Sequence, residues 1–126
     1  MKLATRPAKF VGEIPAWDAS EKLLGDALTS AGYEYEIAPG EGAFYGPKVE
    51  FHVRDAIGRS WQLSTIQIDQ AMPTSFGLQY VGADGEDHTP MMLHRAILGS
   101  LERFIGVYTE HTAGHFPLWL APVQRS

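Results

Sequence analysis

The chain has 126 residues and no cysteine, so it suits one compact domain without disulfides or thiolate metal sites. Its net charge of −5 does not favour stable binding of nucleic acid by the chain alone, and no apolar run reaches membrane-spanning length. Residues 1–10 lack the apolar segment of a secretory signal. We therefore expect a single cytoplasmic domain over residues 1–126 that neither enters a membrane nor holds a stable nucleic acid.

The first predicted elements are a helix and a short strand. Apolar residues recur at helical spacing over residues 15–31, where Pro15 suits the first turn and Gly32 follows the last. Residues 33–37 then favour a strand, which the turn residues at 39–42 end. An amphipathic helix followed by a strand is therefore expected.

Two longer strands come next and are joined by a tight turn. Residues 48–55 alternate, with apolar side chains on one face and polar or charged ones on the other. Residues 57–59 indicate a hairpin turn, and residues 60–68 continue as a second strand. This second strand has polar groups on both faces, which is typical of a strand that lines a site.

The last third of the chain is less regular. Residues 76–81 give no clear pattern, residues 82–87 suit a turn between two antiparallel strands, and residues 91–94 indicate a short strand. Residues 96–108 have apolar side chains at helical spacing, whereas residues 116–122 contain too much proline for a long element. Together the elements predict an α+β fold, in which two helices back a mainly antiparallel sheet.

Four blocks of the sequence resemble one enzyme family, the threonyl-tRNA synthetases. The blocks are residues 42–48, 61–67, 94–104 and 116–124. Their order along the chain matches that family, and the resemblance runs from about Leu3 to Gln124. It implies the C-terminal half of a class II aminoacyl-tRNA synthetase catalytic domain, with motif 3 of that class at residues 99–103.

The resemblance implies five substrate-binding residues. The family's motif 3 arginine pairs with the ATP phosphates, a role that suits a guanidinium because its planar donors match phosphate oxygens and keep their charge. Polar residues of the second long strand face the aminoacyl-adenylate in the family. The five positions are Gln62, Thr65, Gln67, Ser100 and Arg103. For Arg103, an ion pair with Glu102 or Glu110 is the alternative.

Three further residues are candidates for catalysis. In the family, the counterparts of Tyr45 and Lys48 line the amino-acid pocket or its mouth, and that of His94 is one ligand of a zinc ion that holds threonine. A histidine also titrates near neutrality, so His94 suits acid–base chemistry. The alternatives are a packing role for Tyr45, a solvated surface position for Lys48, and a simple hydrogen bond to a neighbour for His94.

No metal site and no cofactor are expected. The family's other zinc ligands fall before residue 1, and one histidine does not make a zinc site. His111 and His115 flank a small-residue turn, but two histidines give only a weak metal signal. His52 and His88 suit ordinary surface positions.

The segments that fall outside the chain lead to the main functional hypothesis. Motifs 1 and 2 of the class are missing, and adenylation without the motif 2 arginine lacks charge stabilisation of its transition state. The chain opens with Met1 and ends at Ser126, which indicates a short free-standing gene. Ser64 stands where the family usually has glycine, and Ile68-Asp69-Gln70 where an Asp-Phe pair is usual.

These points favour a repurposed biosynthetic enzyme that does not charge tRNA. It would be a lyase or dehydratase that performs acid–base dehydration or cyclisation on a small hydroxylated or amino-acid-derived substrate. Two alternatives stay open, namely a non-catalytic binding or regulatory module and a split fragment of an active threonyl-tRNA synthetase. A homodimer is expected, because half of a catalytic domain leaves apolar surface uncovered.

Overall fold

The computed structural model describes residues 1–124 and has an α+β fold built on a five-stranded sheet. The elements are β1 (Lys2–Ala4), α1 (Ile14–Ser30), β2 (Glu36–Ala38), β3 (Lys48–Arg54), β4 (Ser60–Asp69), α2 (Met72–Ser75), β5 (Tyr80–Val81), β6 (Asp87–His88), β7 (Met92–Ala96), α3 (Leu101–Thr112) and a 3-10 turn, η1 (Leu118–Leu120). The strand order in the main sheet is β2-β1-β3-β4-β7, and each neighbouring pair except β1–β2 is antiparallel. The predicted fold class is confirmed.

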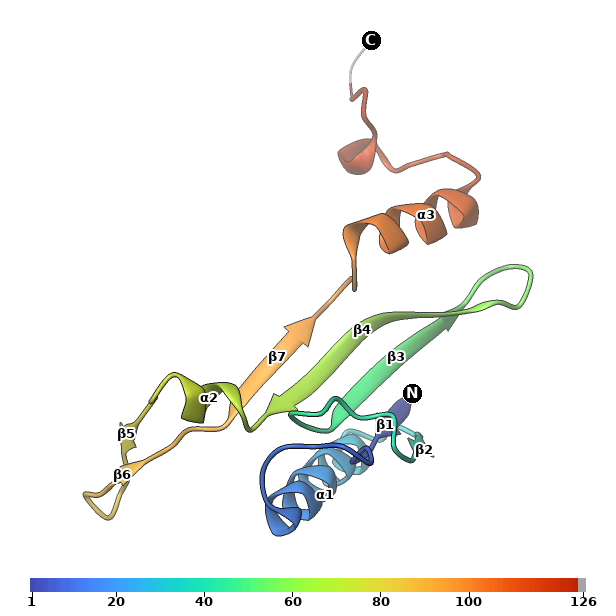
Figure 1. Cartoon of the computed structure of the whole chain (residues 1–126). Coiled ribbons are helices and arrows are strands. Elements are labelled where there is room, and N and C mark those ends of the chain that lie inside the picture. Colours follow the sequence, from blue (N-terminus) through green and yellow to red (C-terminus); the bar gives the residue numbers. More distant parts are fainter. Residues whose placement is uncertain (125–126) are drawn as a thin grey trace.

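Helix α1 packs across one face of the sheet and forms the core with it (Figure 1). Pro15 lies in its first turn, where a missing N–H costs nothing, and Gly32 follows its end with a φ of +75°. The predicted helix is therefore confirmed. Full burial of one large apolar side chain stabilises the fold by about 1.5–3 kcal/mol. The core cluster consists of Leu3, Leu24, Leu28, Val49 and Ile68.

Strand β1 is one of the elements that the sequence does not predict, as are the short helix α2 and the turn η1. Strand β1 lies inside the sheet, parallel to β2 and antiparallel to β3, and Leu3 and Ala4 are fully or almost fully buried. Three residues are too few to reveal a strand by alternation. Strand β2 begins three residues later than predicted, at Glu36, because its partner β1 sets its register.

The hairpin of β3 and β4 agrees with its prediction. Its turn is fixed by the Asp55 carboxylate, which accepts hydrogen bonds from the backbone N–H groups of Ile57 at 3.1 Å and Arg59 at 2.8 Å. Gly58 supplies the left-handed backbone with a φ of +84°. The register shifts between Phe51 and His52, so the end of the hairpin twists away from the rest of the sheet.

Helix α3 begins five residues later than the predicted start at residue 96. Ser100 is its N-cap, and the Ser100 hydroxyl accepts a hydrogen bond from the backbone N–H of Arg103 at 3.1 Å. Gly99 precedes the cap with a φ of +71°, and a Cβ there would lie 2.6 Å from the Leu63 carbonyl oxygen. Apolar residues at helical spacing therefore begin before the helix does. Ala96 is the last residue of β7, and a tight turn separates it from α3.

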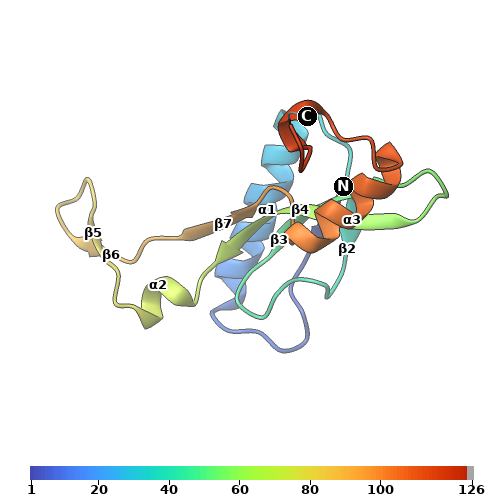
Figure 2. The same cartoon turned by 90° about the horizontal axis from the view of Figure 1, so that it is seen from above.

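The remaining elements extend away from the sheet. Figures 1 and 2 show α2 and the β5–β6 hairpin projecting beyond the start of β7. The predicted turn at residues 82–87 joins these two antiparallel strands, so that prediction is confirmed. Within residues 1–124, no helix has both the length and the apolar character needed to cross a bilayer.

Candidate active site

The sheet face opposite α1 carries a row of polar side chains. Lys48 is paired with Gln67, and Gln67 with His94, across β3, β4 and β7. Because successive strand residues point to opposite faces, these three lie side by side on the face that α1 leaves uncovered. Their neighbours Val49 and Ile68 point into the core. The alternation in the sequence thus places the core side chains on one face of the sheet and the candidate site residues on the other.

His94 is held by a buried carboxylate, Asp69. The Nε2 atom of His94 lies 2.8 Å from Oδ2 of Asp69, whose side chain is almost fully buried. The other oxygen of Asp69 accepts hydrogen bonds from the backbone N–H groups of Ala71 at 2.8 Å and Met72 at 2.9 Å. Burial raises the pKa of Asp69, but the bonds from Met72, His94 and Ala71 outweigh it and lower that pKa. An ionised carboxylate only accepts, so Nε2 of His94 carries a proton and Nδ1 faces away.

Tyr45 completes this part of the site. Its hydroxyl donates to Oε1 of Gln67 at 3.1 Å, and its ring lies edge-on to the His94 ring with centroids 6.4 Å apart. The loop reaches β4 because residue 46 is glycine, since a Cβ there would lie 1.8 Å from the Ile68 carbonyl oxygen. A cavity of about 360 Å³ opens beside the two rings. Its lining residues are Phe44, Tyr45, Asp69, Ala71, Met72, Ser75 and His94.

A second buried carboxylate, Glu50, holds Lys48. The Nζ atom of Lys48 lies 2.7 Å from Oε1 of Glu50, and Nε2 of His52 lies 3.0 Å from Oε2. Burial raises the pKa of Glu50, but the hydrogen bonds and charges of Lys48 and His52 outweigh it and lower that pKa. His52 is therefore half-buried and paired rather than an ordinary surface residue.

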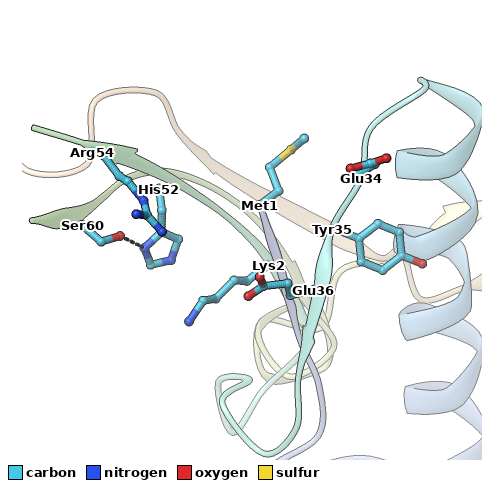
Figure 3. A pocket seen from close by; sticks show the side chains of 8 residues that line it. All are labelled: Met1, Lys2, Glu34, Tyr35, Glu36, His52, Arg54 and Ser60. Carbon is cyan, nitrogen blue, oxygen red and sulfur yellow. Dashed lines mark hydrogen bonds between the residues drawn. The ribbon is translucent and has the colours of Figure 1, made fainter. Parts of the chain in front are cut away.

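Beyond His52 the same face opens into a further cavity, of about 410 Å³. Figure 3 shows His52, Arg54 and Ser60 grouped on one side of it, Lys2 beside Glu36 in the middle, and Tyr35 turned toward α1. The Ser60 hydroxyl lies 3.4 Å from Nδ1 of His52, which makes a long hydrogen bond. The full lining is Met1, Lys2, Glu34, Tyr35, Glu36, His52, Arg54 and Ser60.

The remaining predicted residues lie toward α3. The guanidinium of Arg103 donates to the backbone carbonyl of Gln62 at 2.8 Å, and Ser100 caps the helix on which Arg103 stands. Thr65 lies on the polar face in the row next to Gln67, and its hydroxyl donates to the Val49 carbonyl at 3.0 Å. The structure thus brings Tyr45, Lys48, Gln67 and His94 together and holds Arg103 at the edge of the same sheet.

Sequence analysis missed the two carboxylates that organise the site. In the sequence, Asp69 stands out only as part of a departure from a family pattern, and Glu50 only as one member of a polar face. The available signal is the alternation itself, because Glu50 shares its face with Lys48, and Asp69 shares its face with Gln67. Glu110, an alternative partner for Arg103, instead pairs with Arg59.

The described residues do not complete the zinc site in which the family's histidine takes part. Residues 1–124 contain no group of three or more His, Cys, Asp or Glu side chains placed to hold a metal ion. His94 nevertheless has the form of a metal-ligating histidine, since one ring nitrogen is fixed by a carboxylate. The segment can therefore supply one ligand, and the others would have to come from outside residues 1–124.

Comparison with known proteins identifies the class to which this sheet and site belong. Residues 7–112 match the family model described as tRNA synthetase class II core domain (G, H, P, S and T), so the chain belongs to that family.

Within this family, the similar proteins described next are all named for threonine. A threonine--tRNA ligase of Parvibaculum lavamentivorans is 60% identical over 124 residues, which are 98% of this chain and 19% of the relative. The corresponding enzyme of Symbiobacterium thermophilum is 56% identical over the same shares of the two chains. A solved structure, described as the RNA binding domain of threonyl-tRNA synthetase from Cryptosporidium parvum Iowa II, matches with a TM-score of 0.89 and 42% identity. That match covers 96% of this chain and 31% of the solved one.

These findings confirm the resemblance and overturn the main functional hypothesis. The relatives are ligases, so the biosynthetic lyase or dehydratase that performs dehydration or cyclisation is wrong. That hypothesis relied on motifs absent from the chain, but the chain spans about a fifth of the length of the curated relatives it matches. Motifs absent from so small a share carry no weight against the family's activity.

The predicted partners are corrected as well. A small-molecule substrate without stable nucleic acid conflicts with relatives named for tRNA and with a solved neighbour described as RNA-binding. The error lies in the use of net charge, which sums over the whole chain, whereas RNA responds to the charge of the surface it approaches. The domain limits, the homodimer and the roles of the site residues are not tested by these comparisons and stay predictions.

Proposed function

We propose that this chain forms part of the catalytic core of a threonine--tRNA ligase and acts together with other segments of that core. The observation that carries the proposal is 60% identity over 98% of the chain with such a ligase. The alternative of a synthetase fragment, left open by the sequence, is therefore preferred. The substrates of the complete unit would be threonine, ATP and tRNA.

Exposed apolar side chains support a role within a larger core. Leu93 on β7 and Leu101 on α3 each expose 64% of their surface, and Ile97 between them exposes 65%. No residue of α3 is buried. Apolar surface of this kind on neighbouring elements marks a place where further protein packs, and segments of a class II core that precede or follow this one suit that place.

The site geometry supports specific roles, which we propose for the predicted residues. Tyr45, Lys48, Gln67 and His94 form the polar wall against which threonine and its adenylate lie. The Lys48 ammonium suits the substrate carboxylate or the adenylate phosphate, and the protonated Nε2 leaves Nδ1 of His94 free for a ligand. Gln67, held by the Tyr45 hydroxyl, presents its amide N–H groups to the substrate.

The other predicted residues serve the nucleotide end of the substrate. Arg103 provides a positive charge that stabilises phosphate charge as the bond to the α-phosphate forms and pyrophosphate leaves. Ser100 fixes the first turn of α3 and with it the position of Arg103, while Gln62 supplies the carbonyl that orients the guanidinium. Thr65 ties β4 to β3 through the Val49 carbonyl.

We also propose a cytoplasmic setting. The absence of cysteine, and so of disulfides, fits a reducing compartment, where disulfides are rare.

A chimeric enzyme tests the proposal. The chain replaces the matching 124 residues of the Parvibaculum lavamentivorans ligase, and charging of tRNA with radiolabelled threonine is measured. We expect charging well above that of an Arg103→Ala chimera, with pyrophosphate release that depends on threonine. A folded chimera with the activity of the Arg103→Ala control would contradict the proposed function.

A further inference from the structure

Glu50 is a buried carboxylate in the middle of the site-bearing face. It exposes 5% of its surface, although an unpaired carboxylate at such a position would be strongly disfavoured. Its backbone is paired with Lys2 of β1 on one side and with Thr65 of β4 on the other. The carboxylate thus stands on one of the most firmly held parts of the sheet.

Each oxygen of this carboxylate has a different basic partner. Oε1 is bonded to the Lys48 ammonium at 2.7 Å and Oε2 to the His52 ring at 3.0 Å. The two partners belong to different sites. Lys48 borders Gln67 in the row of the candidate site, whereas His52 lines the cavity of Figure 3. One carboxylate therefore connects the candidate site with the neighbouring cavity.

Lys48 needs such a support more than the other site residues do. A lysine side chain has four rotatable carbons and loses much rotamer freedom when its ammonium is fixed. The side chains of Tyr45 and His94 are themselves rigid rings, which lie edge-on to each other. Lys48 is flexible, and its ionic partner among the described residues is Glu50. A charge-assisted bond at 2.7 Å is short enough to select one rotamer before substrate arrives.

We propose that Glu50 is a positioning residue that fixes the Lys48 ammonium where the proposed adenylation reaction needs it. His52 satisfies the second oxygen and is dispensable for this purpose. The inference rests on the proposed function, because it requires that Lys48 contact the substrate. Glu50 itself does not touch the substrate in this proposal, since only 5% of its surface is exposed.

A double-mutant cycle in the chimeric ligase separates positioning from mere stabilisation. Glu50→Gln, Lys48→Met and the double variant are compared by the KM for threonine in the pyrophosphate-exchange assay. We expect each single change to raise KM about tenfold, as loss of one charge-assisted bond implies, and the double variant to match Lys48→Met alone. A control, His52→Gln, keeps the Lys48 bond and should change KM less than twofold.

The outcomes are distinguishable. If the two single effects multiply to about a hundredfold in the double variant, Glu50 does not act through Lys48 and the inference fails. It also fails if Glu50→Gln leaves KM unchanged while Lys48→Met raises it. If the unmodified chimera charges no tRNA, the proposed function fails instead.

A second readout follows Lys48 directly. Acylation of lysines in the chimera by a water-soluble succinimidyl ester is quantified peptide by peptide with mass spectrometry. Because the Lys48 amine attacks the ester and its 2.7 Å ion pair with Glu50 confines it on a half-buried side chain, Glu50→Gln should speed modification of Lys48 several-fold, with Lys9 unchanged as an internal control. Equal rates at Lys48 in both proteins would overturn the positioning role even if the variant were less stable.

Discussion

The two faces of β4 give a direct test of the fold and the site together. Ile68 is fully buried in the core cluster, whereas its neighbour Gln67 lies on the opposite face and accepts the Tyr45 hydroxyl. Ile68→Ala removes three carbons, a loss of about 2 kcal/mol of transfer free energy, and the remaining cavity brings the cost to about 3–4 kcal/mol. Gln67→Ala leaves the phenol beside an open cavity, where water replaces the lost partner, so we expect a cost below about 1 kcal/mol.

The assay for this pair combines stability with function. Urea unfolding of the full chain, followed by far-UV circular dichroism, gives the free energy of unfolding for each variant. Charging by the chimeric ligase gives the functional effect, where Gln67→Ala should lose at least about tenfold in kcat/KM for threonine. The face assignment is refuted if Gln67→Ala destabilises the chain as much as Ile68→Ala does. A cost below about 1 kcal/mol for Ile68→Ala would refute the core.

Three further predictions concern the hairpin, α3 and the site loop. Arg59→Ala should speed amide hydrogen exchange across α3 relative to Arg59→Lys, because the guanidinium bridges the hairpin turn and the helix; equal exchange in the two variants would contradict this. The Trp61 indole and the guanidinium of Arg59 lower the pKa of Asp55 to about 2, so the turn's stabilisation, complete above the ordinary carboxyl value of about 4, should be lost as pH falls toward 2. Trp61 fluorescence should follow that loss, and Asp55→Asn should abolish the transition. Gly46→Ala should destabilise by more than about 3 kcal/mol, because its Cβ meets a β4 carbonyl at 1.8 Å, whereas Gly106→Ala, in an open helix position, should stabilise by about 0.5–1 kcal/mol in the same urea titration.

The long regular elements could be predicted because their periodicity extends over enough residues. Helix α1 and the β3–β4 hairpin agree with prediction within about one residue at each end. Strand β1 could not be predicted, since its three residues are defined only by partners that lie more than thirty residues away, β2 and β3. The start of α3 was misplaced for a local reason, because the cap at Ser100 outweighs apolar spacing that continues upstream.

The site was predictable in its members but not in its contacts. Similarity to a family indicated Tyr45, Lys48, Gln67 and His94, and the sheet register brings these four together. The carboxylates that hold two of them could not be found from composition, because pairing depends on the register between strands and on the turn after β4. For Glu50, alternation alone places an acid beside the basic Lys48 on one sheet face, whereas Asp69 has Gln67 as its neighbour on that face and meets His94 only through the register of β4 and β7.

The location of the charges shows why the net charge of the whole chain is a poor guide to nucleic-acid binding. Residues 18–26 hold three acids and one base, and residues 84–87 hold three acids, so these two segments account for the whole net charge of −5. The first segment lies in α1, on the far side of the sheet from the site, and the second lies at the projecting β5–β6 hairpin (Figure 1). The rest of the chain is balanced in charge. The net charge of the whole chain is therefore no measure of the charge on the site face, which is the face that an RNA would approach under the proposed function.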